Sequence, residues 1–138
     1  MVTSSPTITA GRTVSMGHRL PSYAGDCASP HGHNVLFEVS VATHGQFVDF
    51  KQVDACLGAV LQDLDHAMVL HEADPLLPVL RGMGFRTVAL SVEPTTEALA
   101  QLVFNEMSLR LAVECVVVHE TAKYSSTVVE PNPEVRRV

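Results

Sequence analysis

One alternating stretch, residues 31–41, constrains the fold of this chain more than any other. Its apolar members are Val35, Phe37, Val39 and Val41, and the polar Asn34, Glu38 and Ser40 stand between them. Successive side chains of a β-strand point to opposite faces, so the alternation predicts a half-buried strand. His31 and His33 continue the apolar face, so both imidazoles lie on one side, where they can bind a single ion.

A third imidazole is available at His18, at the end of the run Thr13–His18, which also alternates like a strand. Pairing of the two strands would bring the three histidines together. Three neutral imidazoles suit zinc and leave a fourth tetrahedral position for water or substrate, which is the catalytic pattern. The alternative is an ordinary surface His-x-His pair, which is common without any metal.

Cys27 lies four residues before His31, in a segment from Pro21 to Pro30 whose proline, serine, glycine and aspartate content predicts a loop. The thiol is either a metal ligand or a buried small hydrophobe, and the second is the commoner fate of a free cysteine. The pattern leaves both open.

Helices are predicted in two places. One follows Asp49, a good N-cap, and the other follows Pro94, capped by Thr95 or Thr96. Main strands are expected over 8–18, with an interruption near Gly11, and over 33–43, 113–120 and 124–129, with a short strand in 85–92. The segment 67–84 is expected to be a loop with one helical turn near 76–81. The order β-β-α-α-β-β predicts an α+β fold, a four-stranded antiparallel sheet with two helices on one face.

Length and charge narrow the class of protein. A chain of 138 residues predicts a single domain spanning 1–138, with flexible ends at 1–6 and 131–138. A net charge of −6 without a basic run argues against nucleic acid and favours a small-molecule partner. Three unpaired cysteines and the lack of a leader or membrane-spanning stretch indicate a cytoplasmic protein with no membrane partner.

Two carboxylates could also take part in catalysis or ligand binding. Asp65 precedes His66, and a carboxylate that orients an imidazole is half of a proton-transfer relay. Glu120 ends an apolar strand and, in a pocket, could accept two N–H bonds from a planar guanidine-like ring edge. The alternatives are a solvated helix-terminal pair and a solvated strand end.

Six motifs in this order resemble the 6-pyruvoyltetrahydropterin synthase family, which includes the 6-carboxytetrahydropterin synthases, over Val14 to Thr127. They are His18-Arg19-Leu20, Cys27-x-x-x-His31-Gly32-His33-Asn34, Val48-Asp49-Phe50, Leu64-Asp65-His66, Pro94-Thr95-Thr96-Glu97-x-Leu99-Ala100 and Glu120-Thr121. The resemblance implies the tunnelling fold and Zn²⁺ held by His18, His31 and His33. It further implies a catalytic set of Cys27, Asp65 and His66, and a pterin-binding set of Glu120, Thr121 and Thr95.

The three residues between Cys27 and His31 resemble the 6-carboxytetrahydropterin synthase branch, because the pyruvoyl enzymes usually have a longer spacing. The implied reaction converts 7,8-dihydroneopterin triphosphate to 6-carboxy-5,6,7,8-tetrahydropterin, acetaldehyde and triphosphate, in 7-deazaguanine (preQ0 or queuosine) biosynthesis. The alternatives are a pyruvoyl-type triphosphate elimination and a zinc- or pterin-binding module without turnover.

The resemblance also implies a homo-oligomer, a hexamer built as a dimer of trimers, whose subunits assemble into a barrel. An open sheet has unpaired edges, and a barrel of subunits would close them.

Overall fold

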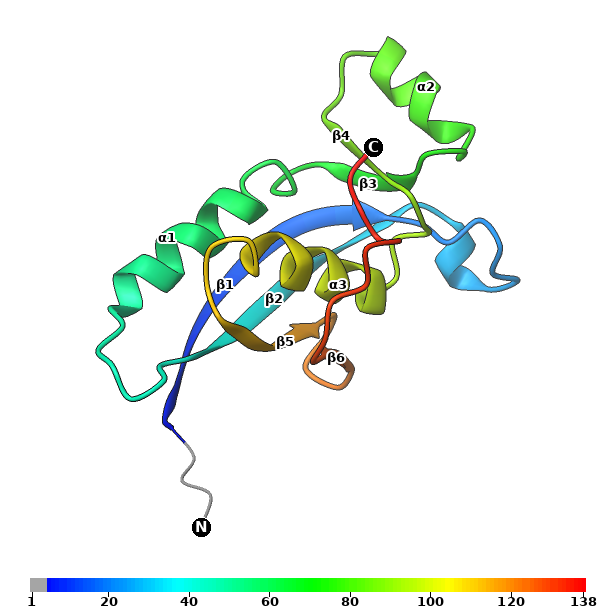
Figure 1. The fold of residues 1–138 in the computed structure, drawn as a ribbon. Coiled ribbons are helices and arrows are strands. Elements are labelled where there is room, and N and C mark those ends of the chain that lie inside the picture. Colours follow the sequence, from blue (N-terminus) through cyan, green and yellow to red (C-terminus); the bar gives the residue numbers. More distant parts are fainter. Residues whose placement is uncertain (1–4) are drawn as a thin grey trace.

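The computed structural model describes residues 5–138, which form a curled, mixed sheet with helices packed on it (Figure 1). The strands are β1 (Thr7–His18), β2 (His31–Ala42), β3 (Met68–His71), β4 (Thr87–Leu90), β5 (Val113–His119) and β6 (Ser125–Val128). The helices are α1 (Phe50–Leu61), α2 (Leu76–Gly82) and α3 (Thr96–Met107), with a short 3-10 turn over Asp26–Ala28. The strand order across the sheet is β4-β3-β1-β2-β5-β6.

β1 and β2 form the long hairpin that carries the core. They pair antiparallel in one unbroken register from Thr7 opposite Ala42 to His18 opposite His31. Phe37 and Val39 are fully buried on the apolar face, as the alternation predicts. The interruption expected near Gly11 is absent, because Gly11 pairs with Glu38 within the ladder.

α1 and α3 cover that apolar face and complete the main core. Asp49 caps α1 by accepting a hydrogen bond from Lys51 N at 2.9 Å, and Thr95 Oγ1 accepts one from Ala98 N at 3.1 Å at the start of α3. Both predicted helices and their caps are therefore confirmed, and Thr95 rather than Thr96 is the second cap.

The prediction of a four-stranded antiparallel sheet is wrong. β3 pairs parallel with β1, and β4 pairs parallel with β3, so the sheet is mixed and has six strands. β3 shows no apolar–polar alternation in the sequence, because Val69 and Leu70 are both fully buried, one on each face of the sheet. A strand covered on both faces is a short apolar run without alternation.

α2 is a third helix, and it lies on the other face of the sheet. Leu77 packs with Leu70 and Ala89 in a small second cluster, separate from the main core to which Val69 belongs. Neighbours in a strand face opposite ways, so α2 lies opposite α1 and α3. The prediction of two helices on one face of the sheet is therefore correct for α1 and α3, but it missed α2 on the other face.

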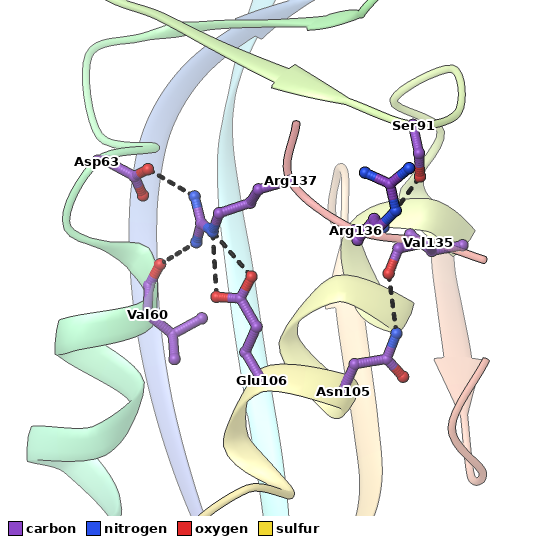
Figure 2. A network of polar contacts seen from close by, with 8 residues as sticks. All are labelled: Val60, Asp63, Ser91, Asn105, Glu106, Val135, Arg136 and Arg137. Atoms are coloured by element: carbon purple, nitrogen blue, oxygen red, sulfur yellow. Dashed lines mark hydrogen bonds and ion pairs between the residues drawn. The ribbon is translucent and has the colours of Figure 1, made fainter. Parts of the chain in front are cut away.

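The C-terminal segment packs on the body of the domain instead of fraying. Arg137 reaches α1 and α3, bonding to Glu106 Oε2 at 2.8 Å, to Asp63 Oδ2 at 2.6 Å and to the Val60 carbonyl at 2.6 Å (Figure 2). Val135 is buried, and Asn105 Nδ2 donates to its carbonyl at 3.0 Å. The expectation of a flexible 131–138 does not describe this packing, which the short polar sequence does not signal. Of the flexible segment expected at 1–6, residues 1–4 lie outside the described residues.

Within residues 5–138, no helix is both long and apolar enough to cross a membrane.

Candidate metal centre and active site

The hairpin register brings three imidazoles together at the end of β1 and the start of β2. His18 stands opposite His31, and His33 follows on the same face. Their ring centroids are 4.6 Å apart for His18 and His31, 5.0 Å for His31 and His33, and 5.3 Å for His18 and His33. Glu120, just after β5, joins them, and one potential ligand atom from each of the four residues lies within 4.8 Å of the others.

Hydrogen bonds to backbone carbonyls set the tautomers of two of these rings. Nδ1 of His18 lies 2.8 Å from the Pro94 carbonyl, and Nδ1 of His31 lies 2.7 Å from the Ser29 carbonyl. A carbonyl only accepts, so each Nδ1 carries the proton and donates it. Each Nε2 is then left with a lone pair, which is the arrangement that metal-binding histidines adopt.

The Nε2 atoms of His18 and His33 are buried without a hydrogen-bond partner. Oε1 of Glu120 lies 3.2 Å from the first and 3.0 Å from the second, at the distance of an ion pair but without hydrogen-bond geometry. Burial lowers the pKa of His18, and the neighbouring His31 and His33 lower it further, against the Pro94 carbonyl and Glu120. A neutral lone pair facing a carboxylate is repulsive unless a cation lies between them.

This donor set fits a divalent metal. Three imidazole nitrogens with one carboxylate oxygen match the ligand preferences of zinc. The four residues could therefore hold a metal ion, and the buried, unpartnered Nε2 atoms are the observation that carries this conclusion.

Cys27 lies in the 3-10 turn of the loop between β1 and β2. Its carbonyl accepts from Leu20 N at 2.7 Å, and the next carbonyl, of Ala28, accepts from Arg19 Nη1 at 3.1 Å. The thiol is half-buried and is not part of the His–Glu group among the described residues. These two hydrogen bonds join the start of the loop, after β1, to its end, before β2. The Cys27 thiol is separate from the four potential metal ligands.

Asp65 and His66 contact each other on the surface. Asp65 Oδ2 lies 3.1 Å from His66 Nδ1, and Asp65 Oδ1 accepts from Ser15 N at 3.2 Å. The His66 hydrogen bond, followed by the Ser15 N–H, lowers the pKa of Asp65. His66 has a φ of 57°, a left-handed conformation that lets adjacent side chains meet. The contact of the acid–imidazole pair is therefore present.

A pocket of about 720 Å³ lies between His66 and the hairpin. Among the residues that line it are Ser15, His31, His33, His66, Phe85 and Arg86. Of the two threonines expected to bind pterin, Thr95 caps α3 and Thr121 Oγ1 accepts from Lys123 N at 3.1 Å, and their contact with a pterin stays a prediction.

The sequence reasoning missed the groups that orient the imidazoles of the candidate metal site. The carbonyls of Pro94 and Ser29 hold His18 and His31, and backbone atoms leave no composition signal. It also treated Glu120 separately from the histidines, because only the pairing of β5 with β2 brings them together.

Three comparisons agree with this architecture. A family model for 6-pyruvoyl tetrahydropterin synthase matches residues 7–131. The chain is 40% identical over 90 residues to a Halobacterium salinarum protein named probable 6-carboxy-5,6,7,8-tetrahydropterin synthase. It is 27% identical over 95 residues to the 6-carboxy-5,6,7,8-tetrahydropterin synthase of Aquifex aeolicus. Both matches cover 62% of this chain and 59% of the relative, so the chain spans about 59% of the length of these relatives.

The fold is similar to that of Caenorhabditis elegans 6-pyruvoyl tetrahydropterin synthase. The TM-score is 0.65 at 20% identity, and the match covers 94% of this chain and 99% of that chain.

Proposed function

Because this chain belongs to the 6-pyruvoyl tetrahydropterin synthase family, we propose that it is a zinc-dependent 6-carboxy-5,6,7,8-tetrahydropterin synthase. The substrate would be 7,8-dihydroneopterin triphosphate, and the products would be 6-carboxytetrahydropterin, acetaldehyde and triphosphate, in 7-deazaguanine biosynthesis. The names of the two relatives support this branch, as does the three-residue spacing between Cys27 and His31. The single observation that carries the proposal is the group of His18, His31, His33 and Glu120, whose ligand atoms lie within 4.8 Å of one another and in which the buried Nε2 atoms of His18 and His33 have no hydrogen-bond partner.

His18, His31 and His33 would hold the zinc, with the first two rings already oriented by Pro94 and Ser29. Bound zinc supplies a Lewis acid that polarises the side-chain oxygens of the substrate and acidifies the adjacent C–H groups.

Proton transfer falls to two separate groups. Cys27 would act as a general base on one side of the substrate. His66, oriented by Asp65, would exchange a proton on the other side, since it faces the pocket next to the hairpin. Glu120, with Thr121 and Thr95, would orient the pterin ring through its amino-pyrimidine edge.

These residues stand on different parts of one subunit, which supports a site shared between subunits. Asp65 and His66 are largely exposed, with His66 opening on the large pocket, so a neighbouring copy would enclose them. The enzyme would accordingly work as a homohexamer, a dimer of trimers, in the cytoplasm.

A product assay tests the function. Zinc-loaded protein is incubated with 7,8-dihydroneopterin triphosphate, the pterin products are separated by mass, and acetaldehyde is trapped as a hydrazone. We expect 6-carboxytetrahydropterin and acetaldehyde in equal amounts. Triphosphate release without acetaldehyde would indicate the pyruvoyl reaction, and zinc and pterin binding with no product would indicate a binding module.

A further inference from the structure

The carboxylate of Glu120 lies against the histidines of the candidate metal site. A residue that only bound the far edge of a pterin ring would not need to lie there. The backbone of Glu120 is fixed where β5 turns toward β6, with its N–H donating to the Tyr124 carbonyl at 3.0 Å. From there its carboxylate turns onto the histidines, with Oε1 at 3.2 Å from His18 Nε2 and 3.0 Å from His33 Nε2.

These two distances are close to those between neighbouring ligands of one ion. Ligand atoms about 2.0–2.2 Å from a tetrahedral zinc lie about 3.3–3.5 Å from one another. Oε1 of Glu120 is therefore close enough to the nitrogens of His18 and His33 to share one ion with them, and a ligand atom of His31 lies within 4.8 Å of the same group.

We propose that Glu120 is the fourth ligand of the metal in the substrate-free protein and the ligand that leaves when a pterin enters. The second half of this inference rests on the proposed function.

Glu120 is less constrained to stay than His18 or His31. The imidazoles of His18 and His31 are held at Nδ1 by carbonyls of the fold. The carboxylate of Glu120 makes no hydrogen bond among the described residues, and its side chain is 25% exposed against 4% for His18.

Release of Glu120 resolves a conflict between binding and catalysis. Four protein ligands make a closed site of the structural kind, whereas a catalytic zinc keeps one position open. Glu120 would give up its place on the metal to a neutral substrate hydroxyl, an exchange of one oxygen ligand for another that would need no electron or proton transfer. The freed carboxylate can then accept N–H bonds from the pterin edge, so one residue serves both steps.

Zinc competition with a chelating dye tests the ligand assignment. We expect Glu120→Gln to bind zinc about 10-fold or more weakly than wild type, the scale of losing one partner of a metal site. Glu130→Gln, an exposed glutamate in the C-terminal segment, should match wild type. Equal zinc affinity for all three proteins would overturn the assignment, and circular dichroism checks that each variant is folded.

Cobalt substitution tests the release. The visible absorption of Co²⁺ depends on its ligands, so the Co²⁺ forms of wild type and Glu120→Gln should differ. Adding neopterin, an oxidised pterin that cannot react, should shift the wild-type spectrum and leave the difference between the two proteins smaller. Neopterin that binds, by its fluorescence, without moving the wild-type spectrum would overturn the release.

The two possible failures are distinguishable. If zinc affinity depends on Glu120 but no product forms and neopterin does not move the cobalt spectrum, the proposed function and the release step fail together, and Glu120 remains a permanent ligand. If the product assay succeeds while zinc affinity is independent of Glu120, the function stands and this inference fails.

Discussion

Single residues at the metal centre divide into those that bind and those that orient. His31 and His33 lie on the same face of β2 and present their rings to His18 across the hairpin. Their roles can be separated by substitution because each ring contributes one nitrogen.

Replacing His33 with Ala should lower zinc affinity by more than about 100-fold, since loss of an outer partner alone costs about 10–100-fold. Wild type should hold about one zinc per chain, and His31→Ala should behave like His33→Ala. Metal analysis after dialysis against a weak chelator measures both. His71→Gln is the matched control, because His71 lies on β3 outside the group. Full zinc content in both alanine variants would refute the three-histidine site.

Cys27→Ala should lower turnover by about 100-fold or more, the scale of a lost general base, while zinc content and thermal stability stay near wild type. Steady-state rates with metal analysis on the same sample decide this. Cys115→Ala, a half-buried cysteine on β5, is the control. A near-wild-type rate for Cys27→Ala would make the thiol structural and leave the base role to His66.

At the scale of elements, a buried ion pair ties the Cys27 loop to α2. Arg19 Nε donates to Asp74 Oδ2 at 2.7 Å while Arg19 Nη1 holds the Ala28 carbonyl. Asp74, whose side chain is fully buried, also accepts from Leu76 N at 2.9 Å at the start of α2. Arg19 thus links the loop, the helix and the strand that ends in His18.

Asp74→Ala should lower the free energy of unfolding by about 2–4 kcal/mol, because it leaves a guanidinium and an N–H without their acceptor. Urea unfolding of the metal-free protein measures the loss. Asp54→Ala is the comparison: Asp54 also pairs with an arginine, Arg12, at 2.7 Å, but both side chains are about half exposed, so the midpoint should hardly move. Equal losses in the two variants would contradict this account.

The C-terminal segment also connects two elements, because Arg137 bonds to Val60 of α1 and to Glu106 of α3. Burial lowers the pKa of Arg137, but the carboxylates of Glu106 and Asp63 outweigh this and raise it, so the guanidinium stays charged. Replacing Arg137 with Met keeps the apolar stem and removes the charge.

Arg137→Met should lower the free energy of unfolding by about 1–3 kcal/mol, the net value of hydrogen bonds to charged groups. Thermal unfolding measures the change. Arg136→Met is the matched control, since Arg136 bonds to Ser91 through backbone atoms: its N–H donates to Ser91 Oγ (Figure 2) and its carbonyl accepts from Ser91 N. An unchanged stability of Arg137→Met would mean that the burial of Val135 and the backbone hydrogen bonds of the segment hold it without the guanidinium.

For the whole molecule, the two sheet edges differ. β4 is partly covered by the C-terminal segment, through the bridge between Leu90 and Arg137 and the bond from Val138 N to Ala89 O at 3.0 Å. β6 ends the sheet on the other side and pairs only with β5 among the described strands. An uncovered strand edge favours pairing with another copy.

The uncovered edge favours self-association, and under the proposed function we expect a ring-shaped hexamer of two trimers in solution. Light scattering coupled to size exclusion at micromolar concentration measures the mass. A monomer would refute the ring and would remove the shared site proposed for Cys27 and His66.

The sequence alone determined the features that repeat along a single element. The faces of β1 and β2, the meeting of three histidines, and the caps Asp49 and Thr95 were predictable because strand and helix periods decide which side a residue faces. Hydrophobic burial then fixes the register of the hairpin, and the metal-binding face comes with it.

Tertiary structure alone decided which elements become neighbours. The parallel addition of β3, the packing of α2 on the opposite face, and the docking of Arg137 join segments whose sequences carry no signal for each other. Glu120 reaches His18 only because β5 pairs with β2, and Pro94 only orients His18 because α3 starts there. Periodicity specifies a face, whereas contact between distant segments depends on how all the faces pack together.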